Sequence, residues 1–220
     1  MPRLPTKRSL PPLKKKPLKK HSATTIQSMR VGGYSTKSTE LKYLDNNAGT
    51  TVNFGVSTFT TPVLLNGASL GSDAINRIGR KLVMKSLLFR WTWNLAATST
   101  GGSPVRIMIV YDKQANAATP AITDILLADS HISQNNLNNR DRFVVLSDEI
   151  SEPVSVQGTP SISGVIYKKL NLETVFNGTN GGTVADITSG SIHVLFSQTA
   201  GIGTANPTVN WRSRIRFYDV

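Results

Sequence analysis

The sequence predicts an all-β protein: a single eight-stranded antiparallel jelly-roll β-sandwich with one short loop helix and a disordered basic N-terminal arm. Three observations lead to this prediction. Ser, Thr and Asn occupy 61 of the 220 positions, and glycine and proline recur along the chain. Short apolar runs, several of them alternating with period two, lie between these turn-rich clusters. The first twenty residues are instead basic and proline-rich, without any such period.

The N-terminal segment carries the strongest charge bias of the chain. Its first twenty residues hold eight Lys or Arg side chains and no acidic one, whereas the remaining 200 residues hold 17 basic and 13 acidic ones. Prolines in the same segment remove backbone donors and oppose helix formation. A block of like charge stays solvated until it meets a polyanion. We therefore expect residues 1–38 to form a disordered arm and residues 39–220 to form the jelly-roll domain.

This arm is the main candidate for nucleic-acid binding, because clustered cations neutralise phosphates with little sequence preference. The candidate residues are Arg3, Lys7, Arg8, Lys14, Lys15, Lys16, Lys19 and Lys20. The segment KKKPLKK at 14–20 also resembles a nuclear localisation signal, through Lys14, Lys15, Lys16, Lys19 and Lys20, which implies nuclear import receptors as partners. A solubilising tail is the alternative, but eight charges within twenty residues exceed what solubility requires.

Seven segments have the pattern of longer strands, and they lie at 40–46, 81–95, 104–113, 142–148, 163–172, 191–198 and 210–220. The segment 81–95 has the clearest alternation. One face is expected to hold Val83, Leu87, Phe89, Trp91 and Trp93, with Lys85 as an exception. The other face is expected to hold Met84, Ser86, Leu88, Arg90, Thr92 and Asn94.

The last strand carries a second basic set. Alternation places Trp211, Ile215 and Phe217 toward the core and directs a second set outward, namely Arg212, Arg214, Arg216 and Tyr218. Like charges along one strand face repel each other unless anions compensate them. Neighbouring carboxylates and the phosphates of a nucleic acid are both able to do so, and alternation alone does not choose between them.

One short helix is predicted in ATPAITDILLADS. Thr119 is the expected N-cap, Pro120 the first helical residue, and Asp124 an early acidic residue. Ile122, Ile125 and Leu126 give the helix its apolar side.

The chain lacks the residue patterns of the common enzyme classes, and we expect no catalytic activity. It contains no cysteine, no glycine-rich phosphate loop and no nucleophile elbow. Its three histidines, His21, His131 and His193, lack metal-ligand spacing. No apolar run is long enough to predict membrane insertion, and no signal peptide is recognisable.

One carboxylate cluster is a weak metal candidate. Asp148, Glu149 and Glu152 could offer oxygen ligands to Ca²⁺ at a subunit contact, whereas a solvated loop is the competing interpretation. No other cofactor is expected.

Three stretches, in their order along the chain, carry a resemblance to a known family. These are RIGRK at 77–81, VRIMIVYDKQANAATPAITDIL at 105–126, and NNLNNRDRFVVLSDE at 135–149. Together with the basic arm, they resemble the capsid proteins of small circular Rep-encoding single-stranded DNA viruses. The same order is similar to coat proteins of the satellite tobacco necrosis virus type, which enclose RNA.

The resemblance implies a capsid protein that self-assembles into a small icosahedral shell of about 60 copies with T=1 geometry. It further implies that the arm and the sheet that carries the last strand face inward, toward a single-stranded DNA genome. Arg77, Arg80 and Lys81 of RIGRK then contact either the genome or neighbouring subunits. The implied location is the virion, with assembly in the host nucleus.

Three alternatives remain at this stage. The chain could be the coat protein of a satellite-type single-stranded RNA virus, or a cellular lectin-like β-sandwich binding module. A jelly-roll enzyme of the cupin kind would need a histidine and carboxylate metal set, which three scattered histidines do not favour.

Overall fold

The computed structural model describes residues 40–46, 52–53, 57–94, 104–152, 161–199 and 208–220, so the expected arm at 1–38 lies outside it. The strands are β1 (Leu41–Asn46), β2 (Val52–Asn53), β3 (Val63–Leu64), β4 (Lys81–Asn94), β5 (Val105–Asp112), β6 (Phe143–Ser151), β7 (Ser161–Phe176), β8 (Ile187–Ser189), β9 (Ser191–Gln198) and β10 (Thr208–Asp219). None of the helices in these ranges is long and apolar enough to cross a membrane.

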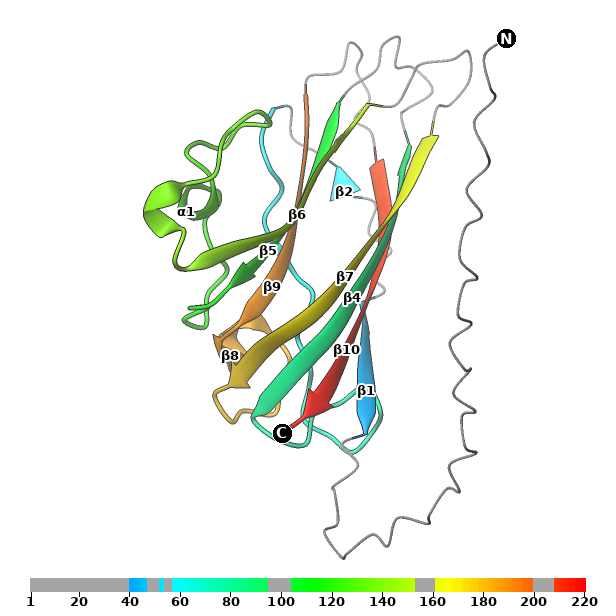
Figure 1. Cartoon of the computed structure of the whole chain (residues 1–220), viewed down its shortest axis with the longest axis vertical. Helices are drawn as coiled ribbons and strands as arrows, with labels where there is room; N and C mark the ends of the chain where they lie inside the picture. Colours follow the sequence, from blue (N-terminus) through cyan, green and yellow to red (C-terminus); the bar gives the residue numbers. More distant parts are fainter. Residues whose placement is uncertain (1–39, 47–51, 54–56, 95–103, 153–160, 200–207) are drawn as a thin grey trace, which may run out of the picture. The chain divides into compact units, whose positions relative to one another are not determined.

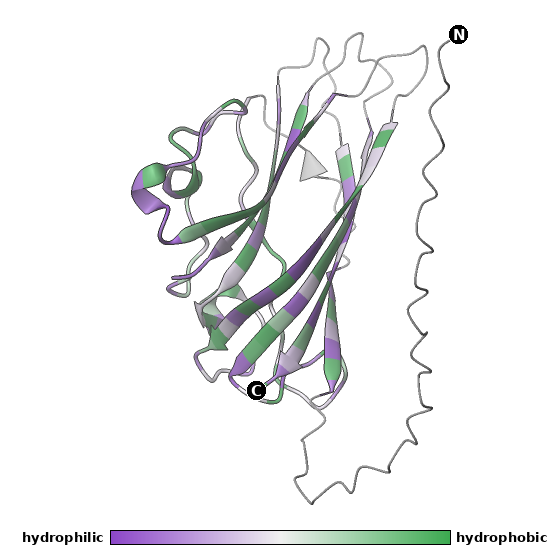
Figure 2. Cartoon of the chain, viewed as in Figure 1, coloured by the Kyte–Doolittle hydropathy of each residue, from purple (hydrophilic) through white to green (hydrophobic). Residues whose placement is uncertain are grey.

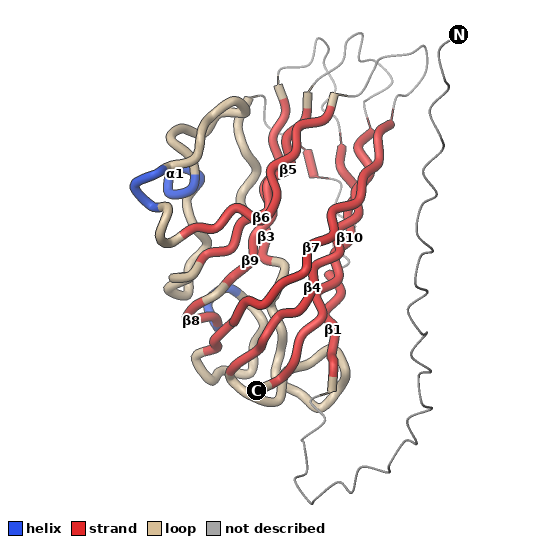
Figure 3. The backbone as a smooth tube through the Cα atoms, in the orientation of Figure 1, coloured by secondary structure: helices blue, strands red, loops and turns tan. Residues whose placement is uncertain are grey.

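Eight of these strands form two four-stranded antiparallel sheets (Figure 1). The order is β1-β10-β4-β7 in the first sheet and β3-β9-β5-β6 in the second, and the short strands β2 and β8 extend the first sheet. The chain crosses between the sheets at most connections, so that strands distant in sequence become neighbours (Figure 3). This is the arrangement of a jelly roll, and the predicted eight-stranded sandwich is confirmed. The short strands β2, β3 and β8 were not predicted.

The main core lies between the two sheets. Phe89 of β4, Phe196 of β9 and Trp211 of β10 are buried there, and the rings of Phe89 and Trp211 stack with centroids 5.4 Å apart. A second apolar cluster lies on the other face of β5, where Met108 and Val110 pack with residues that include Ile125. All eight residues of β5 are buried, because this strand has a core on both faces.

Alternation along β4 breaks at Lys85. Hydrophilic and hydrophobic bands alternate along β4 and β7 in Figure 2. On the C-terminal side of Lys85 the buried residues begin with Leu87, as predicted, but on its N-terminal side they are Leu82 and Met84. The pairing register with both neighbouring strands shifts at the same place. The predicted inward Val83 and outward Met84 are therefore wrong, because an irregularity in register exchanges the two faces.

The predicted helix exists but begins later than expected. Helix α1 spans Ile122–Ile125, and its N-cap is Ala121 rather than Thr119. The carboxylate of Asp124 accepts a hydrogen bond from the Ala121 backbone N–H at 3.1 Å, which satisfies one free donor at the start of the helix. Two short 3₁₀ helices, at Leu137–Asn139 and Val184–Asp186, were not predicted.

Arg77 is a buried structural residue. Its guanidinium lies 4.2 Å from the ring centroid of Phe176 and donates hydrogen bonds to the carbonyl oxygens of Ala68 (3.0 Å), Gly79 (2.9 Å) and Thr179. These bonds tie the loop before β4 to the loop after β7. Its side chain is only 1% exposed, so the expected contact of Arg77 with a genome or a neighbouring subunit is wrong.

An ion pair with a buried carboxylate joins two of the stretches that carry the family resemblance. Asp112, at the end of β5, is fully buried and accepts hydrogen bonds from Arg142 at 2.9 and 2.8 Å. This bidentate contact raises the pKa of Arg142. It joins the two ends of the loop that covers the second sheet. The stretches YDKQ and NRDRF thus contribute a residue each to a contact within the fold.

The two arginines of RIGRK provide a matched test of this interpretation. We expect R77M to lower the free energy of unfolding by about 3 kcal/mol, because it leaves buried carbonyl groups without a donor. R80M changes an exposed residue and should cost less than about 1 kcal/mol. Urea unfolding followed by tryptophan fluorescence measures both, and equal losses would contradict a special role for Arg77.

Candidate nucleic-acid interface

The outward face of the first sheet is basic. Arg212, Arg214 and Arg216 of β10 are exposed, and they alternate with buried residues at 211, 213, 215 and 217. The predicted orientation of this strand is therefore confirmed. Arg90 of β4 is exposed on the same face and lies opposite Arg212 of β10. Lys169 of β7 is also exposed there and lies opposite Ser86 of β4. We call Arg90, Lys169, Arg212, Arg214 and Arg216 the basic sheet face.

Arg214 is compensated within the chain. Its guanidinium donates two hydrogen bonds of 2.6 Å to the carboxylate of Asp45 on β1 and lies 5.0 Å from the ring centroid of Tyr43. Its hydrogen bonds lower the pKa of Asp45. For this arginine, a neighbouring carboxylate compensates the charge.

Arg212 and Arg216 differ from Arg214. Among the residues that the structure describes, neither forms an ion pair, and the same holds for Arg90. Arg212 lies directly opposite Arg90 in the β10–β4 register. Like charges placed opposite each other on one face are destabilising, so the pair favours an anion between or beside its members.

The sequence pattern alone does not identify Arg90 as a binding residue. Its outward position was predicted correctly from the alternation in 81–95. Only the strand order, which places β4 beside β10, reveals that it faces Arg212.

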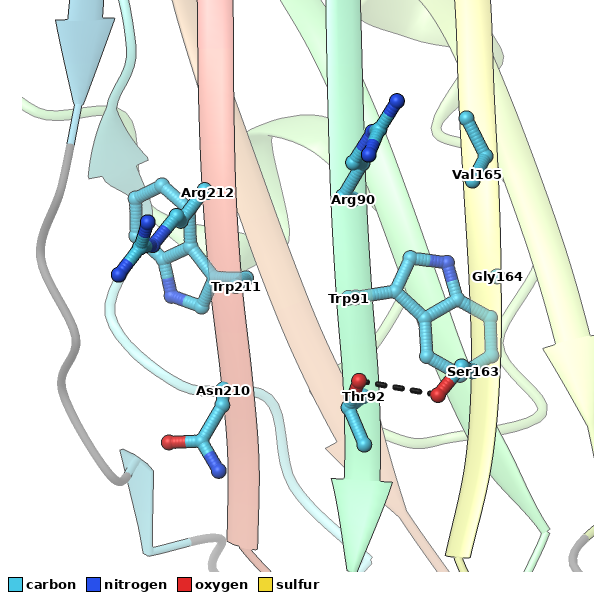
Figure 4. A pocket seen from close by; sticks show the side chains of 9 residues that line it. All are labelled: Arg90, Trp91, Thr92, Ser163, Gly164, Val165, Asn210, Trp211 and Arg212. Atoms are coloured by element: carbon cyan, nitrogen blue, oxygen red, sulfur yellow. Dashed lines mark hydrogen bonds between the residues drawn. The ribbon is translucent and has the colours of Figure 1, made fainter.

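A hollow lies in the basic sheet face over the middle strand β4, and we call it the sheet hollow (Figure 4). Its volume is about 480 Å³. It is lined by Arg90, Trp91, Thr92, Ser163, Gly164, Val165, Asn210, Trp211 and Arg212. Figure 4 shows Arg90 and Arg212 at one level on neighbouring strands, with Asn210, Thr92 and Ser163 further along them. The Thr92 and Ser163 hydroxyls are 2.9 Å apart and hydrogen-bonded.

The arm residues predicted to bind nucleic acid all lie outside the described residues. They are Arg3, Lys7, Arg8, Lys14, Lys15, Lys16, Lys19 and Lys20, and the nuclear localisation segment is among them. Their role stays a prediction.

The carboxylate cluster is divided by the alternation of β6. Asp148 accepts two hydrogen bonds of 2.7 Å from Arg106, whose guanidinium also donates to the carbonyl oxygen of His131. Glu149 accepts a hydrogen bond from the Ser147 hydroxyl at 3.1 Å, and Glu152 follows the end of β6. Within the described ranges, no group of three or more His, Asp or Glu side chains is placed to hold a metal ion.

Two histidines are buried in the second sheet and the loop that covers it. His131 Nδ1 lies 2.9 Å from the Ser197 hydroxyl, and His193 Nε2 lies 2.9 Å from the Ser191 hydroxyl. Burial lowers the pKa of both, and that of His193 falls to about 4. Both imidazoles are therefore neutral at pH 7 and act as packed polar groups of the fold. His21 lies outside the described residues.

The family model of the satellite tobacco necrosis virus coat protein matches residues 15–215, nearly the whole chain. The chain belongs to this coat-protein family. As a coat protein, it is a structural, non-enzymatic component of a virion that assembles with copies of itself into a shell. This membership decides against the lectin-like module and the cupin-like enzyme.

Other comparisons add little to the coat-protein assignment. No curated protein sequence matches the chain. The solved structures that match include one described as a marine algae virus of the order Picornavirales, with 12% identity over 100% of this chain and 88% of the other. Its TM-score of 0.17 is too low to indicate a shared strand arrangement.

The Asp45–Arg214 pair predicts a pH-dependent contribution to stability. Because the folded-state pKa of Asp45 lies below its ordinary value of 3.8, the pair stabilises the fold above that pH and loses its contribution as the pH falls through the folded pKa. We expect D45N to unfold at lower urea concentration than the parent at pH 6, with the difference shrinking as the pH falls below 3.8. A difference that is unchanged across this range would contradict the assignment.

Proposed function

We propose that this coat protein forms a T=1 shell of about 60 copies around a single-stranded DNA genome, with its N-terminal arm and its basic sheet face turned toward the nucleic acid. The observation that carries this proposal is the outward placement of Arg90, Arg212 and Arg216 on a coat-protein sheet, without carboxylate partners among the described residues. Phosphates supply the missing negative charge without requiring a particular base sequence.

Charge counting supports a major role for the arm. Eight cations in the first twenty residues, multiplied by about 60 copies, give roughly 500 positive charges per shell. Such a number offsets a sizeable part of the charge of a single strand of one to two kilobases, at one charge per phosphate. We further propose that Lys14, Lys15, Lys16, Lys19 and Lys20 direct import into the host nucleus before assembly.

The choice of DNA rests on the resemblance of RIGRK and YDKQAN to the capsid proteins of small circular DNA viruses. In the fold, Arg77 of the first stretch binds backbone carbonyl groups and Asp112 of the second pairs with Arg142, so these two residues do not themselves recognise a genome. The genome type therefore needs a direct experiment.

Deletion of residues 1–20 tests the role of the arm. We expect the truncated chain to fold with unchanged circular dichroism but to package less than about half as much nucleic acid, because most of the excess charge is lost. Light scattering with absorbance at 260 and 280 nm measures particle mass and content together. Full packaging by the truncated chain would refute the arm hypothesis.

Competitive assembly tests the genome type. Equal amounts of circular single-stranded DNA and of RNA of the same length are offered to the dissociated full-length chain, and the particles are treated with nucleases before extraction. We expect DNA to predominate several-fold in the particles. Predominance of RNA would instead support the coat protein of a satellite-type RNA virus.

A further inference from the structure

Arg90 and Arg212 form a pair of directly opposed cations on the first sheet. Both side chains are exposed, they face each other across β4 and β10, and neither has an ion-pair partner in the described part of the chain. Directly opposed like charges cost free energy in a sheet. An anion that contacts both guanidiniums removes this cost and forms charge-assisted hydrogen bonds with each.

The surroundings of the pair indicate on which side the anion binds. Arg90 and Arg212 border the sheet hollow and also a second hollow of about 330 Å³, which is lined in addition by Asp45, Leu88, Ser213 and Arg214. The carboxylate of Asp45 already holds Arg214 there, and its negative charge disfavours another anion. Among the residues that the structure describes, no acidic side chain lines the sheet hollow. The electrostatic potential is therefore more favourable for a phosphate in the sheet hollow than in the second hollow.

The remainder of the sheet hollow suits the uncharged part of a nucleotide. Val165 is 61% exposed and offers an apolar wall for a sugar or base. The hydroxyls of Thr92 and Ser163 and the amide of Asn210 offer donors and acceptors at the far end. A volume of about 480 Å³ lies within the range of small-ligand sites.

We propose that the sheet hollow binds one nucleotide unit of a single-stranded nucleic acid, with its phosphate held between Arg90 and Arg212. This inference rests on the proposed function but adds a defined contact separate from the arm. It assigns Arg212 and Arg90 to phosphate binding, leaves Arg214 to Asp45, and makes Ser163, Val165 and Asn210 the lining for the sugar or base.

Photo-crosslinking of the full-length chain tests the proposal. The probe is a short oligodeoxythymidine that carries one 5-iododeoxyuridine, and mass spectrometry locates the modified peptides. We expect crosslinks both in arm peptides and in peptides that contain residues 161–169 or 208–212. R90Q/R212Q should lower the sheet crosslinks about tenfold, because two charge-assisted contacts are lost. S163L fills the hollow without changing its charge or adding an aromatic ring that could stack on a base, and it should also abolish them.

K113Q/R140Q is the matched control, since it removes two exposed cations of the loop that covers the second sheet, outside the basic sheet face. It should leave the sheet crosslinks within about twofold of the parent, because neither side chain lines the sheet hollow and exposed charges are screened by salt. Circular dichroism confirms that each variant folds. Sheet crosslinks that survive S163L, or that fall equally in K113Q/R140Q, would overturn the hollow in favour of diffuse charge binding. Arm crosslinks without sheet crosslinks would overturn this inference alone, and absence of both would overturn the proposed function.

Discussion

The two sheets of this jelly roll differ in what covers their outward faces, and this difference determines where a large ligand can bind. The loop between β5 and β6 folds over the second sheet and buries Met108 and Val110 under Ile125. The first sheet has no such cover within the described residues, and its outward positions carry exposed cations. A sandwich needs only one apolar face per sheet, so the first sheet is free to use its other face for charge.

Internal ion pairs decide which of these cations remain available. Arg214 is held by Asp45, Arg142 by Asp112 and Arg106 by Asp148, each through two hydrogen bonds. Arg77 instead donates its hydrogen bonds to backbone carbonyl groups. The net charge of the chain is therefore a poor guide to its binding surface. The binding surface depends on the arginines that have no carboxylate partner among the described residues, and on the first sheet these include Arg90 and Arg212.

Period-two patterns predicted the seven longer strands and the outward arginines of β10, because alternation is a local property of a half-buried strand. The coat-protein assignment also followed from local stretches in a fixed order. The partners of those arginines could not be predicted in this way. Asp45 lies 169 positions from Arg214, and Arg90 faces Arg212 only because β4 pairs with β10.

The N-cap at Ala121 was missed because the carboxylate of Asp124 satisfies the helix start without a capping side chain at Thr119.

The register shift at Lys85 has a consequence for how the length of this chain can vary. Met84 faces the core, Ser86 faces outward, and one residue separates them. Removing that residue, or adding one beside it, would restore regular alternation while every other side chain of β4 keeps its face. A one-residue change near Phe89 would instead invert one whole end of the strand and move tryptophans out of the core. A gain or loss of one residue is thus compatible with the faces of this central strand at one point and disrupts them along the rest of it.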